Sequence, residues 1–109
     1  MPLEIRGPKD EGVEAIASAL EAYALDHPRA EITLYRYSPL SVRIRIVDPA
    51  FAAMRRVERN DLVWDRLDQL SEEEQADVNM VLLLAPDEVE TSPGNLEFEH
   101  PVEPSSAGI

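Results

Sequence analysis

Arginine side chains and one asparagine gather in the middle of this chain, at Arg43, Arg45, Arg55, Arg56, Arg59 and Asn60. A guanidinium group is permanently charged and planar, so it binds carboxylates or phosphates through paired hydrogen bonds. Residues 29–66 hold eight arginines against five acids, whereas residues 67–109 hold eleven acids and no base. Because the formal net charge is −12, this basic centre is where we expect a partner to bind. These residues form the predicted partner-binding surface.

Two alternating segments are expected to position the first arginines. Residues 42–46 alternate apolar and charged side chains, which predicts a strand over residues 42–47 with one buried face. Residues 31–37 alternate in the same way, and the short connection over residues 38–40 joins the two strands as an antiparallel hairpin. If the apolar side chains of both strands face the core, Tyr35 and Tyr37 share the open face with Arg43 and Arg45.

Helical signals flank this hairpin. Asp10 is expected to cap a first helix that ends at His27, because the residue before a proline is pushed out of helical geometry. Apolar spacing predicts a main helix over residues 57–70. Ser71, with a glutamate three residues later, predicts the start of a short third helix. The apolar run over residues 77–84 predicts a last strand, joined by a crossover and parallel to the second strand.

Both ends of the chain differ in character from its centre. Residues 1–9 contain two prolines and a glycine, which predicts an irregular leader before a domain over residues 10–86. Residues 87–109 are acidic and proline-rich, so we expect a flexible tail. An alternative is that Leu96 and Phe98 add a short strand to a sheet edge. Opposite charges on tail and centre also favour self-association or an internal clasp.

Composition narrows the class of protein. A chain of 109 residues is expected to form one domain, and no apolar run is long enough to cross a membrane. The N-terminal residues lack a secretory pattern, so cytoplasm is the expected compartment. The absence of cysteine excludes disulfides and thiolate sites. Asp48 and Asp61 are the best candidates for a general acid or base, but no nucleophile–histidine pair accompanies them, and we expect no enzymatic activity.

The expected order of helix, strand, strand, helix, short helix and strand resembles the type II KH-like fold. The middle of the chain carries one motif made of Phe51, Val57, Arg59, Leu62, Val63 and Leu67. In its residue types and spacing, this motif resembles that of the BolA-like family. The resemblance spans about two-thirds of the chain. It implies an α+β fold in αββααβ order, with a three-stranded mixed sheet and helices on one face.

Two positions depart from the family pattern. Ala53 stands where the family has a glycine, and Asn60 stands where it has its signature histidine. In the family, that histidine is linked to an iron–sulfur cluster shared with a monothiol glutaredoxin. An amide is a poor ligand for such a cluster, so we expect no cluster and no other cofactor. Asn60 is instead expected to cap its helix or lie in its first turn.

Taken together, these patterns predict a small noncatalytic BolA-like adaptor that binds a protein partner. A nucleic-acid-binding KH-like module is the first alternative, but the chain lacks the Gly-x-x-Gly loop of KH domains and its net charge disfavours polyanions. A homodimer that buries the open sheet face across a two-fold axis is the second alternative. We expect no interaction with membranes.

Overall fold

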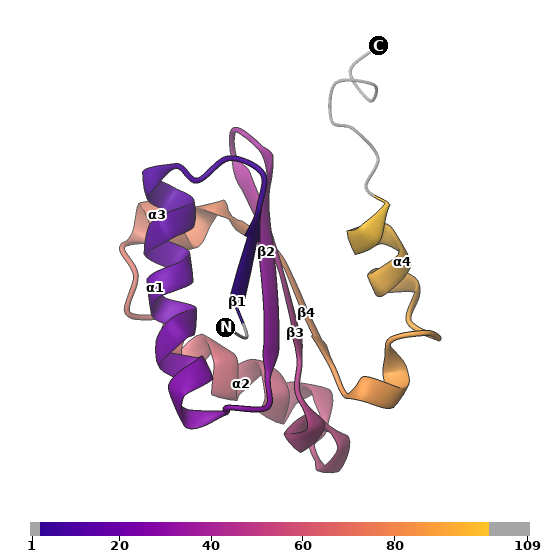
Figure 1. The fold of residues 1–109 in the computed structure, drawn as a ribbon. Helices are drawn as coiled ribbons and strands as arrows, with labels where there is room; N and C mark the ends of the chain where they lie inside the picture. The colour runs from indigo at the N-terminus through magenta and orange to yellow at the C-terminus, as the bar shows by residue number, and fades with distance from the viewer. Residues whose placement is uncertain (1–2, 101–109) are drawn as a thin grey trace.

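The computed structural model describes residues 3–100, which form a four-stranded mixed sheet with helices on both of its faces (Figure 1). The α+β class is therefore confirmed. Within residues 3–100 no helix has the length and apolar character needed to cross a membrane. In chain order the elements are β1 (Leu3–Arg6), α1 (Glu11–Asp26), β2 (Glu31–Ser38), β3 (Ser41–Val47), the 3-10 helix η1 (Pro49–Ala53), α2 (Arg56–Leu67), α3 (Glu72–Asp77), β4 (Val78–Leu84), the 3-10 helix η2 (Pro86–Glu88) and α4 (Pro93–Glu99).

The strands lie side by side in the order β1-β2-β3-β4. Strands β2 and β3 form the predicted antiparallel hairpin, with Ile32 opposite Ile46 and Leu34 opposite Ile44. Strand β4 pairs in parallel with β3, as predicted. The alternating apolar side chains of the hairpin face the core because each side chain two residues on returns to the same face.

A fourth strand corrects the predicted three-stranded sheet and the irregular leader. Strand β1 pairs in parallel with β2, placing Leu3 opposite Ile32 and Ile5 opposite Leu34. The alternating segment has four residues and ends at Gly7, which has a φ of 75°. Such a segment is too short for its periodicity to predict a strand. The strand forms because the open edge of β2 offers unpaired backbone groups and a place for two apolar side chains.

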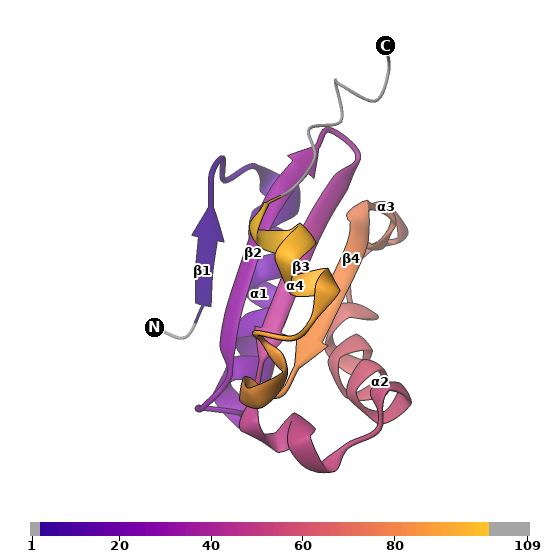
Figure 2. The ribbon, with the colours of Figure 1, turned by 90° about the vertical axis from the view of Figure 1, so that its right-hand side faces the viewer.

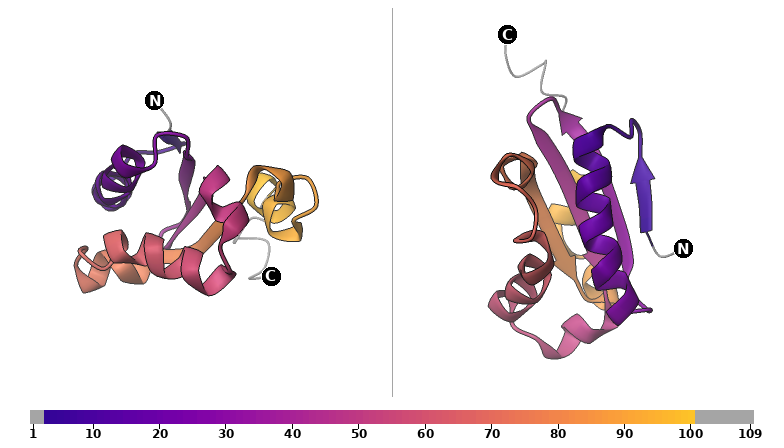
Figure 3. Two further views of the ribbon diagram at one scale, coloured as in Figure 1. Left: turned by 90° about the horizontal axis from the view of Figure 1, so that it is seen from below. Right: turned by 90° about the vertical axis from the view of Figure 1, so that its left-hand side faces the viewer.

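Helices α1, α2 and α3 cover one face of the sheet (Figure 3). The side chain of Asp10 accepts a hydrogen bond from Val13 N at 2.9 Å, so the predicted cap of α1 is confirmed. Ser71 and Glu74 form the predicted capping box of α3. The largest fully buried side chains of the core between helices and sheet are Val13, Ile16, Leu20, Tyr23, Ile32, Leu34, Val42, Ile44, Ile46, Phe51 and Leu67.

The main helix begins and ends earlier than predicted. Helix α2 runs from Arg56 to Leu67, preceded by Arg55, whose backbone N–H donates to the Glu58 carboxylate at 2.8 Å. Asn60 therefore lies in the second turn of the helix, where its side chain is exposed, and the prediction that it caps the helix or lies in its first turn is wrong.

The placement of α4 corrects the prediction of helices on one face. Helix α4 crosses in front of β3, on the face opposite α1 (Figure 2). Ser92 caps α4 by accepting from Asn95 N at 3.2 Å, so Leu96 and Phe98 lie in a helix and not in an added strand. The predicted tail over residues 87–109 thus includes helix α4. Its remaining part, residues 101–109, lies outside the described residues.

Candidate functional site

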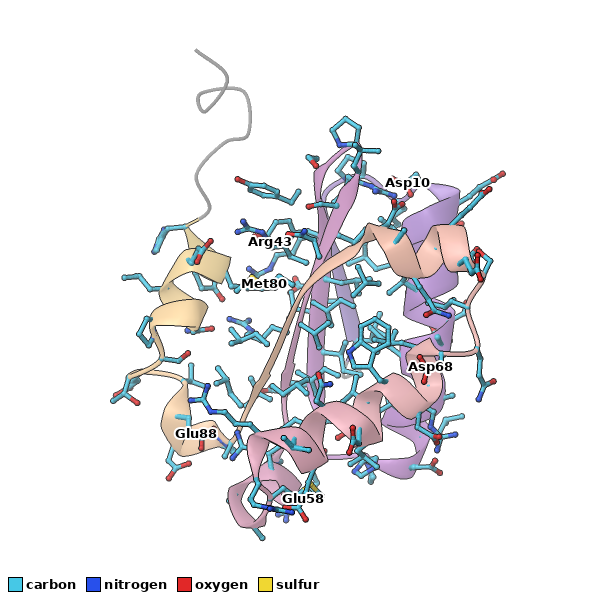
Figure 4. All side chains as sticks on the ribbon, turned by 180° about the vertical axis from the view of Figure 1, so that it is seen from behind. Asp10, Arg43, Glu58, Asp68, Met80 and Glu88 are labelled. Atoms are coloured by element: carbon cyan, nitrogen blue, oxygen red, sulfur yellow. The ribbon has the colours of Figure 1, made fainter. Side chains whose placement is uncertain are left out.

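The face of the sheet that α4 covers is where we place the candidate site. The strand register puts Tyr35 opposite Arg43 and Arg43 opposite Met80 on this face, and Arg45 opposite Leu82. Figure 4 shows Arg43 and Met80 pointing from the sheet towards α4. We call this surface the arginine face and define it by Tyr35, Tyr37, Arg43, Arg45, Met80 and Leu82.

Arg43 is buried under α4 but only partly satisfied. It is 7% exposed, and its guanidinium carbon lies 3.6 Å from the centre of the Tyr37 ring, so the predicted tyrosine–arginine contact is confirmed. Its Nη2 atom lies 3.5 Å from a Glu97 carboxylate oxygen. Within residues 3–100 its Nε and Nη1 atoms have no hydrogen-bond partner. Buried donors without acceptors are costly, so this guanidinium retains capacity for another acceptor.

Arg45 binds the polar side chains of α4. Its Nη1 atom donates to Asn95 Oδ1 at 2.7 Å and to a carboxylate oxygen of Glu99. The other Glu99 oxygen accepts from Arg6 Nη1 at 3.0 Å. Burial raises the pKa of Glu99, but the hydrogen bonds from Arg45 and Arg6 outweigh it and leave the pKa below its ordinary value. The Glu99 carboxylate is therefore held in its charged form by two arginines.

Phe98 is the apolar anchor of α4. It is 1% exposed, and its ring lies edge-on to the Tyr35 ring with centroids 5.0 Å apart. The Tyr35 hydroxyl donates to the Phe98 carbonyl oxygen at 3.0 Å, and the Arg45 guanidinium carbon lies 4.8 Å from the centre of the Phe98 ring. Gly94 permits close approach, because a Cβ there would lie 2.9 Å from a Leu82 methyl group.

Arg59 has a different role from the arginines of the sheet. It is 6% exposed, although it lies on a surface helix. Its Nε donates to Met54 O at 3.2 Å and its Nη1 to Leu83 O at 3.1 Å. Both terminal nitrogens donate to Glu88, at 2.7 and 3.0 Å. Arg59 therefore ties η1, α2, β4 and η2 together, and its donors are used within the fold.

The structure does not bring the six predicted binding residues together on one surface. Arg43 and Arg45 lie beneath α4, and Arg59 is buried. Arg55, Arg56 and Asn60 are exposed at the start of α2. The Arg55 side chain is 83% exposed and pairs with Glu58 at 3.4 Å. The predicted partner-binding surface is thus divided into two arginines covered by α4, one buried arginine within the fold and three exposed residues at the start of α2.

The pairing of Arg59 with Glu88 predicts a specific acid sensitivity. The Arg59 guanidinium, assisted by the Ala85 N–H, lowers the pKa of Glu88 from 4.5 to about 2. Because the unfolded chain takes up this proton first as the pH falls, the pair stabilises the fold above about pH 5 and loses its contribution between about pH 4.5 and pH 2. We expect the unfolding free energy of Glu88→Gln, measured in urea, to fall less steeply over that range than that of the wild type.

The exposed Glu90 on the same connection offers the matched control. Among the described hydrogen bonds and ion pairs, Glu90 has no arginine partner. Glu90→Gln therefore removes the same charge without breaking an ion pair, and its unfolding free energy should fall with pH as steeply as that of the wild type. Equal slopes for Glu88→Gln and the wild type would contradict the assignment.

A second polar cluster joins residues that the sequence analysis left apart. The Tyr23 hydroxyl donates to Asp48 Oδ2 at 2.7 Å, and His27 Nδ1 lies 3.3 Å from the same oxygen. The rings of Tyr23 and His27 stack with centroids 4.1 Å apart. Burial and the bond to Asp48 raise the pKa of Tyr23, so its hydroxyl remains a donor. The Ala50 N–H occupies the second oxygen of Asp48. The only signals in the sequence were a histidine at a helix end and an aspartate at a strand end.

Removing the Tyr23 hydroxyl should destabilise the whole fold. Tyr23→Phe leaves a buried carboxylate with one hydrogen bond fewer, and we expect a loss of about 1–3 kcal/mol in the free energy of unfolding, measured in urea. Tyr35→Phe is the matched control, because its hydroxyl bonds only α4 among the described contacts, and it should cost less. A larger loss for Tyr35→Phe would contradict this ranking.

The arginine face is not fully covered by α4. A hollow of about 430 Å³ lies across β1, β2 and β3 and is lined in part by Glu4, Arg6, Thr33 and Arg45. A second hollow, of about 260 Å³, is lined in part by Phe98 and Arg6. Arg6 and Arg45 therefore line hollows that remain open while α4 is in place.

No protein-family model, curated protein sequence or solved structure matches this chain.

Proposed function

We propose that this protein is a small noncatalytic adaptor of BolA-like architecture whose arginine face binds an acidic segment of a protein partner. The order of elements from α1 to β4 supports the architecture. The observation that carries the function is the set of contacts from Arg43 and Arg45 to carboxylates and a phenylalanine of the same chain. A face that binds an acidic helix within the molecule has the chemistry to bind one from another protein.

A protein segment fits this face better than a nucleic acid does. Guanidinium groups bind carboxylates and phosphates alike, but a net charge of −12 repels a polyanion at a distance. The acids Glu4 and Glu31 also line the 430 Å³ hollow across β1, β2 and β3. The apolar side of the face, at Tyr35 and Leu82, suits an aromatic or aliphatic side chain next to a carboxylate. The exposed Arg55, Arg56 and Asn60 remain predicted contacts at the rim.

Affinity purification from the native cell tests this function. Tagged full-length wild type is compared with Arg45→Gln and with Arg29→Gln. Arg29 is exposed in the turn between α1 and β2, outside the proposed contacts, and its substitution removes one charge of the same sign. We expect a protein that the wild type and Arg29→Gln retain and that Arg45→Gln loses. Retention equal in all three, or no protein beyond the tag control, would contradict the proposal. Recovery of nucleic acid, with an affinity that falls steeply with salt, would favour the KH-like alternative.

The same purification separates the homodimer alternative. A second copy of this chain as the retained protein, with a mass by light scattering that doubles, would replace the adaptor proposal with self-association. A monomer that retains a different protein through Arg45 supports the adaptor.

A further inference from the structure

The side chains of α4 that meet the arginine face follow one helical pattern. Asn95, Phe98 and Glu99 occupy positions i, i+3 and i+4, which lie on one side of an α-helix. Each has its own contact on the sheet: Asn95 and Glu99 with Arg45, and Phe98 with Tyr35. Leu96, between them, is 65% exposed. The arginine face thus binds a polar acceptor, an aromatic ring and a carboxylate at fixed positions along one side of the helix.

We propose that α4 is a built-in ligand of the arginine face, and that the partner displaces it with a short acidic helix of the same pattern. The partner segment carries a side-chain oxygen acceptor at position i, an aromatic residue at i+3 and a glutamate or aspartate at i+4. This inference rests on the proposed function and specifies its partner. Recognition of one helix face by a groove is a common mode of peptide binding.

The attachment of α4 is weak enough for exchange. Between residues 86 and 100, Phe98 is the one apolar side chain that is fully buried. A helix of seven residues does not persist in water without tertiary contacts. The carboxylates that hold it, Glu97 and Glu99, are 60% and 33% exposed in their side chains, and ion pairs with solvent access contribute little. Segments with few buried contacts open locally without unfolding the domain.

Arg43 supplies an independent reason for an outside ligand. Glu97 reaches one terminal nitrogen of Arg43 only at 3.5 Å. The other two nitrogens have no hydrogen-bond partner within residues 3–100, although the residue is 7% exposed. A partner segment whose carboxylate reaches Arg43 more directly makes contacts that α4 leaves unmade. It can therefore bind more tightly than the ligand it displaces.

A peptide titration on the full chain tests the exchange. The probe is a fluorescein-labelled peptide with the sequence of residues 92–100, SPGNLEFEH. The receptor is the full chain carrying Phe98→Ala and Glu99→Gln. These two substitutions remove the contacts that the Phe98 ring and the Glu99 carboxylate make with the arginine face, and they change no residue of the sheet. We expect this variant to bind the probe about tenfold or more tightly than the wild type does, because a tethered α4 competes at an effective concentration in the millimolar range.

Three controls sharpen the titration. The full-chain variant Leu96→Ala alters an exposed residue of α4 and should bind the probe as weakly as the wild type. The same peptide carrying Phe98→Ala should not bind the released receptor. Glu99→Lys, which sets a cation against Arg6 and Arg45, is a second way to free the face and should match the first receptor.

Equal binding of the probe by wild type and both released variants, or equal binding of the altered peptide, would overturn the inference. The two proposals fail separately. A partner retained through Arg45 together with a negative titration rejects the exchange alone. A positive titration without any retained partner rejects the adaptor function alone.

Discussion

Replacing Phe98 by alanine should free α4 from the sheet while the rest of the fold stays intact. Truncating a buried phenylalanine costs about 3–5 kcal/mol, and no other side chain between residues 86 and 100 is both apolar and fully buried. The free energy lost with the Phe98 ring therefore exceeds the stabilisation that the other contacts of α4 with the sheet provide. Amide hydrogen exchange should show protection in α4 falling by about a hundredfold or more. Protection in β2 and β3 should remain close to that of the wild type.

The variant Leu96→Ala is the matched control for this experiment, since it shortens an exposed side chain of the same helix. It should leave exchange in α4 within a few-fold of the wild type. If Phe98→Ala instead lowered protection in α4 and in the core strands together, α4 would be part of the cooperative fold and not a separable cover.

Replacing Arg59 by alanine should destabilise the entire domain, whereas the effect of Phe98→Ala is confined to α4. The substitution leaves the carbonyl oxygens of Met54 and Leu83 without their donor and removes the partner of Glu88. Loss of a buried hydrogen-bonded cation of this kind costs about 2–4 kcal/mol. The free energy of unfolding in urea, followed by circular dichroism, measures it.

Arg55→Ala provides the comparison, because the Arg55 side chain is exposed and surface substitutions usually change stability by less than about 0.5 kcal/mol. Similar stability for the two variants would contradict a structural role for Arg59 and return it to the predicted binding surface.

The fold followed from the sequence where the signals were local. Alternation over the hairpin fixed which side chains face the core, since a shift by one residue would reverse them all. Asp10 and Ser71 marked helix starts through hydrogen bonds to nearby backbone groups. The same parity argument placed Arg43 and Arg45 on the open face beside the tyrosines.

The remaining elements depend on contacts between distant parts of the chain. Strand β1 forms by pairing with β2. Helix α4 forms because Phe98 packs against Tyr35, a residue 63 positions earlier in the chain. No local pattern in a seven-residue segment specifies such a partner. The burial of Arg59, by contrast, had a signal: Arg59, Val63 and Leu67 are spaced by four and share one buried stripe of α2. Because Arg59 is charged, it was assigned to the surface, although its spacing from Val63 and Leu67 indicated a position in the core.

The most direct measurement is the nuclear Overhauser effect between the rings of Tyr35 and Phe98 in the full-length protein. The central claim is that the arginine face holds an acidic, aromatic helix, and these ring centroids lie 5.0 Å apart. We predict cross-peaks between the two rings and helical chemical shifts over residues 93–99. Random-coil shifts in that segment, with no cross-peak to Tyr35, would contradict the account.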